Sequence, residues 1–233
     1  MKIRVADYIA DMLVKNGIHH VFSVTGGGAM HLNDGLGHKE GLTCIYNHHE
    51  QACAIAAESY ARINNQIAAV CVTTGPGGTN AITGVLGGWL DSIPMLILSG
   101  QVRYDTTVRS TGLNIRAYGD QEYDIVKMVS NITKYAWMVT DAADIRYCLE
   151  KALYLAKTGR PGPVWLDIPL NVQGAYIETE QLRGYDPLEE QKNVVPKVTD
   201  ELAKEIIAKI RNAKRPVFNA GNGIRIAGAA EIF

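Results

Sequence analysis

The sequence predicts an α/β fold, in which a parallel sheet has helices on both faces and is followed by the start of a second α/β domain. Short apolar runs alternate with helical patterns from residue 6 to residue 169, and glycine-rich or polar turns directly follow several of the runs. Parallel strands need long crossover connections, and helices supply them. Ligands of such sheets bind outside the carboxyl ends of the strands, where these turns lie.

The amino-terminal elements follow the apolar pattern in order. Residues 6–16 have the spacing of an amphipathic helix, and Gly17 is placed to end it. A buried strand over 21–24 then leads through the turn Thr25-Gly26-Gly27-Gly28 into a helix from about residue 29. Further strands are expected near 42–46, 67–73 and 94–99, with a helical stretch between each pair.

The next segment, residues 101–121, shows no periodicity. A structureless connection longer than about 12 to 15 residues is uncommon in a compact domain, so a functional loop is favoured over a merely mobile one. Beyond it, the pattern predicts a helix over 141–157 that Gly159 ends, and a last strand over 160–169.

The domain organisation follows from composition. Residues 1–173 are expected to form the first domain, and the polar, acidic and proline-containing stretch 174–197 to form a linker. In residues 198–233 we expect a helix capped at Thr199-Asp200, a strand and turn over 216–223, and a further helix over 227–233. These few elements cannot bury a core of their own, so the second domain is expected to be truncated.

Composition also excludes some classes of function. The 233 residues are 47% hydrophobic and 20% charged, with a formal net charge of -1, so there is no electrostatic footprint for nucleic acid or a membrane surface. The apolar runs are too short to span a bilayer, and no signal core is present, which favours a cytoplasmic protein. The four cysteines have no paired spacing, and no metal site is expected.

Glu50 is the leading candidate for site chemistry, because it stands between an expected strand and an expected helix. The next strand ends in the glycine-rich turn Thr73-Thr74-Gly75-Pro76-Gly77-Gly78-Thr79-Asn80. No lysine follows this turn, as a phosphate loop requires, and it does not match the dinucleotide fingerprint. Taken alone, it reads as a tight strand-to-helix turn. His48 and His49 also precede Glu50, although packed or hydrogen-bonded histidines are commoner there than catalytic ones.

The motifs together carry a family resemblance. They are His48-His49-Glu50-Gln51, the glycine-rich turn 73–80, Asp91-Ser92-Ile93-Pro94-Met95, Ser99-Gly100-Gln101-Val102 and Gly159-Arg160-Pro161-Gly162-Pro163. In this order they resemble the N-terminal pyrimidine-binding region of thiamin-diphosphate-dependent enzymes, most closely the acetolactate synthase large-subunit group. The resemblance covers residues 1 to about 175. It implies that residues 198–233 begin that family's central Rossmann-like domain.

The resemblance implies roles for individual residues. In this family, a glutamate at the place of Glu50 hydrogen-bonds a ring nitrogen of the cofactor's aminopyrimidine and so activates it. Gln121 matches a polar residue near the cofactor or substrate, and the two are the expected catalytic residues. The remaining residues expected to bind the cofactor are Thr25, Gly26, Gly27, Thr73, Pro76 and Asn80, of which the glycine pair approaches the cofactor of a partner subunit.

The implied function is that of a lyase or transferase that decarboxylates and joins small 2-oxo acids with thiamin diphosphate. The family holds the diphosphate and Mg²⁺ through a domain with a Gly-Asp-Gly motif, which is absent from this chain, so the chain alone is expected to be inactive. The implied assembly is a homodimer or homotetramer with the cofactor at the subunit interface. FAD, present in some relatives, has no support in the sequence.

Departures from the acetolactate synthase pattern leave the substrate open. Val24-Thr25 replaces tyrosine and proline, and Asp120 replaces a phenylalanine before Gln121. A relative acting on a nucleotide-sugar or another 2-oxo acid is therefore an alternative. A truncated, non-catalytic dimerisation or binding module is the rival from another class. A nicotinamide-dependent oxidoreductase is more distant, because no glycine fingerprint with a downstream acid is present.

Overall fold

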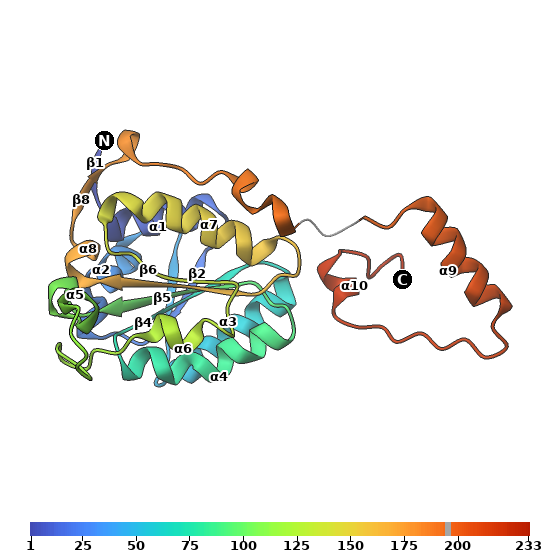
Figure 1. Cartoon of the computed structure of the whole chain (residues 1–233), viewed down its shortest axis with the longest axis horizontal. Coiled ribbons are helices and arrows are strands. Elements are labelled where there is room, and N and C mark those ends of the chain that lie inside the picture. The colour runs from blue at the N-terminus through green and yellow to red at the C-terminus, as the bar shows by residue number, and fades with distance from the viewer. Residues whose placement is uncertain (194–196) are drawn as a thin grey trace. The chain divides into compact units, whose positions relative to one another are not determined.

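A computed structural model describes residues 1–193 and 197–233 of the chain. By their internal contacts these form two units, Met1–Pro187 and Leu188–Phe233. The first unit contains the predicted parallel sheet with helices on both faces, which confirms the fold class (Figure 1). In the described part of the chain, no helix is long and apolar enough to cross a membrane.

The central sheet has six strands in the order β3-β2-β4-β5-β7-β6, and every pair is parallel. Strands β4, β5 and β7 are buried along their whole length, as expected for the middle of a sheet that is covered on both faces. The strands span β2 His20–Ser23, β3 Thr43–Tyr46, β4 Ala68–Val72, β5 Met95–Gln101, β6 Tyr135–Met138 and β7 Pro163–Pro169.

Two apolar clusters show which helices cover each face. One cluster packs α1 (Val5–Lys15), α2 (Met30–His38), α7 (Ile145–Lys157) and α8 (Leu170–Gln173) against the sheet. The other packs α3 (Glu50–Asn64), α4 (Pro76–Leu90) and α6 (Ile125–Val129) against the opposite face. Figure 1 shows α1 and α7 on one side of the strands and α3, α4 and α6 on the other. The helices therefore cover both faces of the sheet and leave the ends of its strands uncovered.

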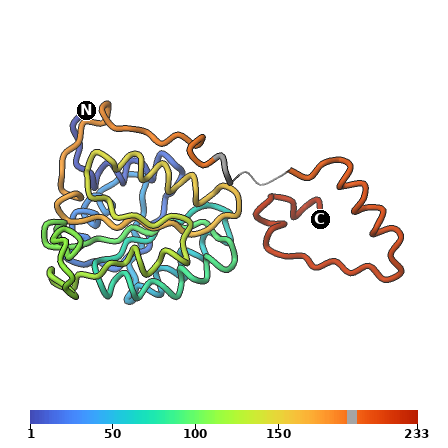
Figure 2. The backbone as a smooth tube through the Cα atoms, in the orientation of Figure 1, coloured from blue at the N-terminus to red at the C-terminus, as the bar shows by residue number. Residues whose placement is uncertain are grey.

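A second, two-stranded sheet was not predicted from the sequence. Strand β1 (Lys2–Arg4) pairs antiparallel with β8 (Tyr176–Glu178), so the amino-terminus lies beside the orange segment near residue 177 (Figure 2). Strand β8 falls inside the range 174–197 that we predicted as a linker. Residues 194–196 of that range lie outside the described residues, and the predicted domain boundaries stay a prediction.

The second unit contains α9 (Asp200–Asn212), whose first turn is capped by Thr199 as the sequence predicted. The expected strand over 216–223 is wrong: residues 216–221 have no regular structure, and α10 (Gly223–Ile226) follows them. A strand needs neighbours for its backbone hydrogen bonds, and the described residues of this unit include no other strand. The expected helix over 227–233 is also wrong, since turns occupy that range.

The long connection after β5 is ordered by short helices. It contains the 3-10 turn η2 (Tyr104–Thr106) and the helix α5 (Val108–Thr111), both shorter than sequence periodicity can reveal. A further 3-10 turn, η3 (Ala142–Asp144), begins the predicted helix over 141–157. The remaining 3-10 turns are η1 (Gly27–Ala29), η4 (Thr179–Gln181) and η5 (Pro187–Asn193).

Helices α3 and α4 are in close contact because small residues face each other. A Cβ atom at Gly84 would lie 2.6 Å from the Cβ of Ala54 and 2.7 Å from its backbone carbon. Backbone cannot move aside as a flexible side chain can. Gly87, one turn further along α4, has nothing within 4 Å of such a Cβ.

We predict opposite effects for alanine at these two glycines. Gly84→Ala should lower the free energy of unfolding by about 1–3 kcal/mol, because the added methyl group forces α3 and α4 apart. Gly87→Ala is the matched control and should raise it by about 0.5–1 kcal/mol, since alanine favours a helix over glycine. Urea denaturation of both variants measures the difference. Equal effects at the two positions would contradict the close helix contact.

Candidate functional site

Three neighbouring strands bring the predicted site residues to one edge of the sheet. Strand β2 lies between β3 and β4 and is parallel to both. Thr25, Gly26 and Gly27 follow β2, Glu50 follows β3, and the glycine-rich turn 73–80 follows β4. The loops therefore leave the sheet side by side, at the edge where parallel sheets bind ligands.

Glu50 is the first residue of α3. The His49 ring caps this helix by accepting a hydrogen bond from the backbone N–H of Gln51 at 3.1 Å, which gives His49 a structural task. The Glu50 side chain is half-buried, and its Oε2 accepts a hydrogen bond from the Asn80 amide at 3.0 Å. Its Oε1 lies 3.6 Å from where a Cβ of Gly77 would be. Asn80 thus holds one carboxyl oxygen, while glycine leaves room around the other.

Gly75 lets the glycine-rich turn meet the segment that carries Gln121. Gly75 has φ 55° and ψ -114°, a conformation that side chains other than glycine rarely adopt. A Cβ at Gly75 would lie 2.1 Å from the carbonyl oxygen of Gln121. Gln121 itself has a positive φ of 57°. The contact is made by the Gln121 backbone, and its side chain is exposed.

Thr73 connects the turn after β4 to the turn after β2. Its hydroxyl accepts a hydrogen bond from the Gly28 N–H at 3.0 Å. A Cβ at Gly26 would lie 2.5 Å from the Cβ of Thr73, so only glycine permits this approach. Thr73 therefore has a clear packing role at the place where the resemblance predicted cofactor binding.

The structure brings most of the predicted residues to the same edge, where some are in contact and others are exposed. Glu50 and Asn80 are hydrogen-bonded, and both Thr73 and Glu50 border the space beside Gly77. Pro76 is the exposed first residue of α4. Thr25 and Gly27 are exposed on the neighbouring turn. No group of three or more His, Cys, Asp or Glu side chains in the described ranges is placed to hold a metal ion.

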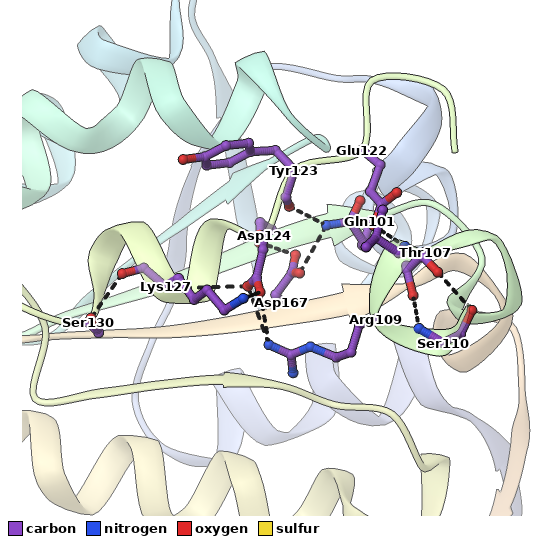
Figure 3. Close-up of polar contacts among 12 residues, drawn as sticks. Gln101, Thr107, Arg109, Ser110, Glu122, Tyr123, Asp124, Lys127, Ser130 and Asp167 are labelled. Atoms are coloured by element: carbon purple, nitrogen blue, oxygen red, sulfur yellow. Dashed lines mark hydrogen bonds and ion pairs between the residues drawn. The ribbon is translucent and has the colours of Figure 1, made fainter. Parts of the chain in front are cut away.

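A layer of buried polar residues beneath the site was not predicted from the sequence. Gln101, the last residue of β5, is 1% exposed, and Asp167 on β7 is fully buried. The Gln101 Nε2 donates to Asp167 Oδ2 at 3.1 Å, and the Ser99 hydroxyl donates to Asp167 Oδ1 at 2.6 Å (Figure 3 shows the Gln101 contact). Polar residues inside otherwise apolar strands were the available signal, because buried polar groups need partners.

Burial governs the acidity of Asp167. Loss of hydration raises the pKa of its carboxyl to about 7, although the hydrogen bonds from Ser99 and Gln101 act to lower it. This carboxyl therefore keeps its proton to a higher pH than an exposed aspartate does.

Comparisons with known proteins show which family the sequence matches. Residues 3–128 match a family described as "Thiamine pyrophosphate enzyme, N-terminal TPP binding domain". The chain is 35% identical over 225 residues to an acetolactate synthase large subunit of Lactococcus lactis, a match that covers 97% of this chain and 37% of that protein. It is 34% identical over 238 residues to the acetolactate synthase large subunit of Haemophilus influenzae, covering 99% of this chain and 39% of the relative.

A plant relative gives a similar result. The chain is 32% identical over 224 residues to the chloroplastic acetolactate synthase of Arabidopsis thaliana, covering 94% of this chain and 31% of the relative. The chain thus spans less than two fifths of the length of these curated relatives.

The buried Asp167 should make stability depend on pH. Its pKa is about 7 in the folded protein and about 3.9 in an unfolded chain. Between these values the folded protein keeps a proton that the unfolded chain has released. The stabilisation from this proton is complete below about pH 4 and is lost as the pH rises to about 7, by up to about 1.4 kcal/mol per pH unit.

We therefore expect Asp167→Asn to flatten the pH dependence. Asparagine has a similar shape and keeps a carbonyl oxygen that can accept a hydrogen bond, but it has no proton to lose in this pH range. Urea denaturation between about pH 5 and about pH 7 should show a smaller fall in the free energy of unfolding for the variant than for the wild type. The same fall in both proteins would show that Asp167 does not carry the raised pKa.

Proposed function

Because the chain belongs to the family of thiamine pyrophosphate enzymes, through their N-terminal TPP-binding domain, we propose that it forms the cofactor-activating part of an acetolactate-synthase-like enzyme. The substrates are small 2-oxo acids, which the enzyme decarboxylates and joins. The observation that carries this proposal is the Glu50 carboxyl, held by Asn80 at the shared edge of β2, β3 and β4.

The residues present fit the pyrimidine end of thiamin diphosphate. A nitrogen heterocycle with an exocyclic amine needs a carboxyl group at its edge and little bulk around its face. Glu50 supplies the carboxyl, and Gly77 leaves space beside its Oε1. Pro76 and Asn80 are exposed next to it and are assigned to the surroundings of the ring. When bound, the cofactor supplies the electron sink that 2-oxo-acid decarboxylation requires.

The proposed role of Glu50 is to hold a proton at a ring nitrogen of the aminopyrimidine. Asn80 keeps the carboxyl in place by donating to Oε2 at 3.0 Å, which leaves Oε1 for the cofactor. A proton held by a positioned side chain contributes roughly 10²–10⁴-fold to a rate. Gln121 is assigned to the cofactor or substrate side of the same edge, with its side chain exposed and its backbone against Gly75.

The assembly we propose is a homodimer or homotetramer with the cofactor at the subunit interface. Thr25, Gly26 and Gly27 would approach the cofactor from the turn after β2, where Thr25 and Gly27 are exposed. The family resemblance assigns the diphosphate and Mg²⁺ to a further domain, and the proposal includes no flavin. We also propose a cytoplasmic location.

A departure from the acetolactate synthase pattern beside Gln121 bears on the acceptor substrate. Asp120 is exposed immediately before Gln121, at a position where the acetolactate synthase group has an aromatic ring. A carboxylate in place of the ring changes the polarity beside Gln121, so the acceptor need not be pyruvate. A 2-oxo acid other than pyruvate, or a nucleotide-sugar, is the alternative substrate.

The proposal predicts that Glu50→Gln removes most thiamin-diphosphate-dependent turnover. In the enzyme that contains this chain, decarboxylation of pyruvate or another 2-oxo acid should fall at least 100-fold, because an amide cannot exchange the proton that the carboxyl holds. The rate of CO₂ release with saturating thiamin diphosphate and Mg²⁺ measures it.

The matched control is Glu58→Gln, the same substitution two turns further along α3. Glu58 pairs with Arg62 away from the strand ends, so turnover should stay within about twofold of wild type, since the substitution removes a carboxylate that lies outside the candidate site. Full activity of Glu50→Gln would overturn the catalytic role. No thiamin-diphosphate-dependent activity in the wild type would instead favour a non-catalytic binding module.

A further inference from the structure

Gln101 uses all of its hydrogen-bonding capacity inside the protein. Its Oε1 accepts from the Thr74 hydroxyl at 2.5 Å and from the Val102 N–H at 3.0 Å. Its Nε2 donates to the Tyr123 carbonyl at 2.9 Å and to Asp167 at 3.1 Å. A side-chain amide has two donors and one oxygen with two lone pairs, so no further partner can be added. Figure 3 shows the Gln101 amide between Tyr123 and Asp167.

Two of these partners belong to the two segments that meet at the candidate site. Thr74 directly precedes Gly75 in the glycine-rich turn, and Tyr123 lies two residues after Gln121. The same two segments touch where Gly75 meets the Gln121 carbonyl. One buried side chain therefore holds both sides of a contact that has no room for a side chain at position 75.

The partners of Gln101 determine which way its amide faces. A flipped amide would place its oxygen against the Tyr123 carbonyl, which can only accept, and its NH₂ group against the Val102 N–H, which can only donate. Asp167 on β7 accepts from the same Nε2 through one oxygen and from the Ser99 hydroxyl through the other. The orientation of the amide is therefore fixed by backbone groups on both sides, with Asp167 as a further partner of Nε2.

Glu122, the residue before Tyr123, is hydrogen-bonded to other parts of the same loop. Its carboxylate accepts from the backbone N–H groups of Val108 at 2.6 Å, Tyr118 at 2.9 Å and Gly119 at 3.3 Å. Hydrogen bonds from backbone N–H groups to a carboxylate are among the stronger ones in proteins. Glu122 thus connects residues 108, 118 and 119 to the segment that contains Tyr123, which Gln101 holds.

We propose that Gln101 is a positioning residue of the candidate site, which holds the glycine-rich turn and the segment carrying Gln121 in one fixed relation. Through Thr74 it sets the start of the turn that presents Pro76 and Asn80. Through Tyr123 it sets the segment that presents Gln121. The inference rests on the proposed function, because it concerns the same cofactor site, but the coupling of the two segments exists in the chain without any cofactor.

Hydrogen exchange in the 233-residue chain tests the coupling directly. Gln101→Met removes every bond of the amide at similar volume, and we expect backbone exchange in residues 75–80 and 118–124 to become at least tenfold faster in both segments. Thr74→Val removes only the bond to the turn, so exchange should rise in 75–80 while 118–124 stays close to wild type. Mass spectrometry of peptides from each segment provides the measurement.

The matched control is Thr158→Val. It removes a hydroxyl that donates to the Tyr154 carbonyl at 2.8 Å, in the connection that precedes β7 at the opposite edge of the sheet. Exchange in both site segments should be unchanged in this variant. Unchanged exchange in Gln101→Met, or equal increases in Gln101→Met and Thr158→Val, would overturn the positioning role.

Turnover separates this inference from the proposed function. In the enzyme that contains this chain, Gln101→Met should lower kcat at least tenfold, and Thr158→Val should leave it within about twofold of wild type. A wild type with thiamin-diphosphate-dependent activity and a fully active Gln101→Met variant would overturn the positioning role and leave the function intact. A wild type without such activity would overturn the function, while hydrogen exchange would still decide the coupling.

Discussion

The parallel pairing of β2 with β3 on one side and β4 on the other is the constraint on which the site depends. Ser23, the last residue of β2, is opposite Tyr46 of β3 and Cys71 of β4. This register makes the following turns start at the same level of the sheet. A slip of one residue would turn every side chain of a strand to the other face and break both apolar clusters. The apolar cores on the two faces therefore also fix where Glu50 stands relative to the glycine-rich turn.

Close approach between the turns completes the arrangement. Gly26 lies against Thr73, and Gly75 lies against the backbone of Gln121. In each contact, a neighbouring group occupies the space that a Cβ atom would need. Glycine is therefore required at both positions. The polar layer of Gln101 and Asp167 lies beneath and has no contact with Glu50 among its hydrogen bonds. The hydrogen bonds that join the two segments and the proposed contact of Glu50 with the cofactor thus involve different residues at the same edge.

Local patterns predicted much of the fold and the leading site residues. The strands β2, β3, β4, β5 and β7 and the longer helices between them follow from apolar periodicity, and Glu50 stands out because a carboxyl group begins a helix directly after a strand. Strand β6 was missed because it is only partly buried, and the β1–β8 pair because its two strands are far apart in sequence. The expected strand over 216–223 was wrong because an apolar run forms a strand only beside another strand. Gln101 had no predicted role, since its side-chain partners Thr74, Tyr123 and Asp167 are brought near it only by folding.

The central claim is that the Glu50 carboxyl meets the pyrimidine ring of thiamin diphosphate at this edge of the sheet. The most direct test is a crystal structure of the enzyme that contains this chain, with thiamin diphosphate and Mg²⁺ bound. The account predicts a carboxyl oxygen of Glu50 within about 3 Å of a ring nitrogen of the aminopyrimidine, a hydrogen-bonding distance, with Pro76 and Asn80 beside the ring. A bound cofactor whose pyrimidine ring lies away from Glu50 would contradict it.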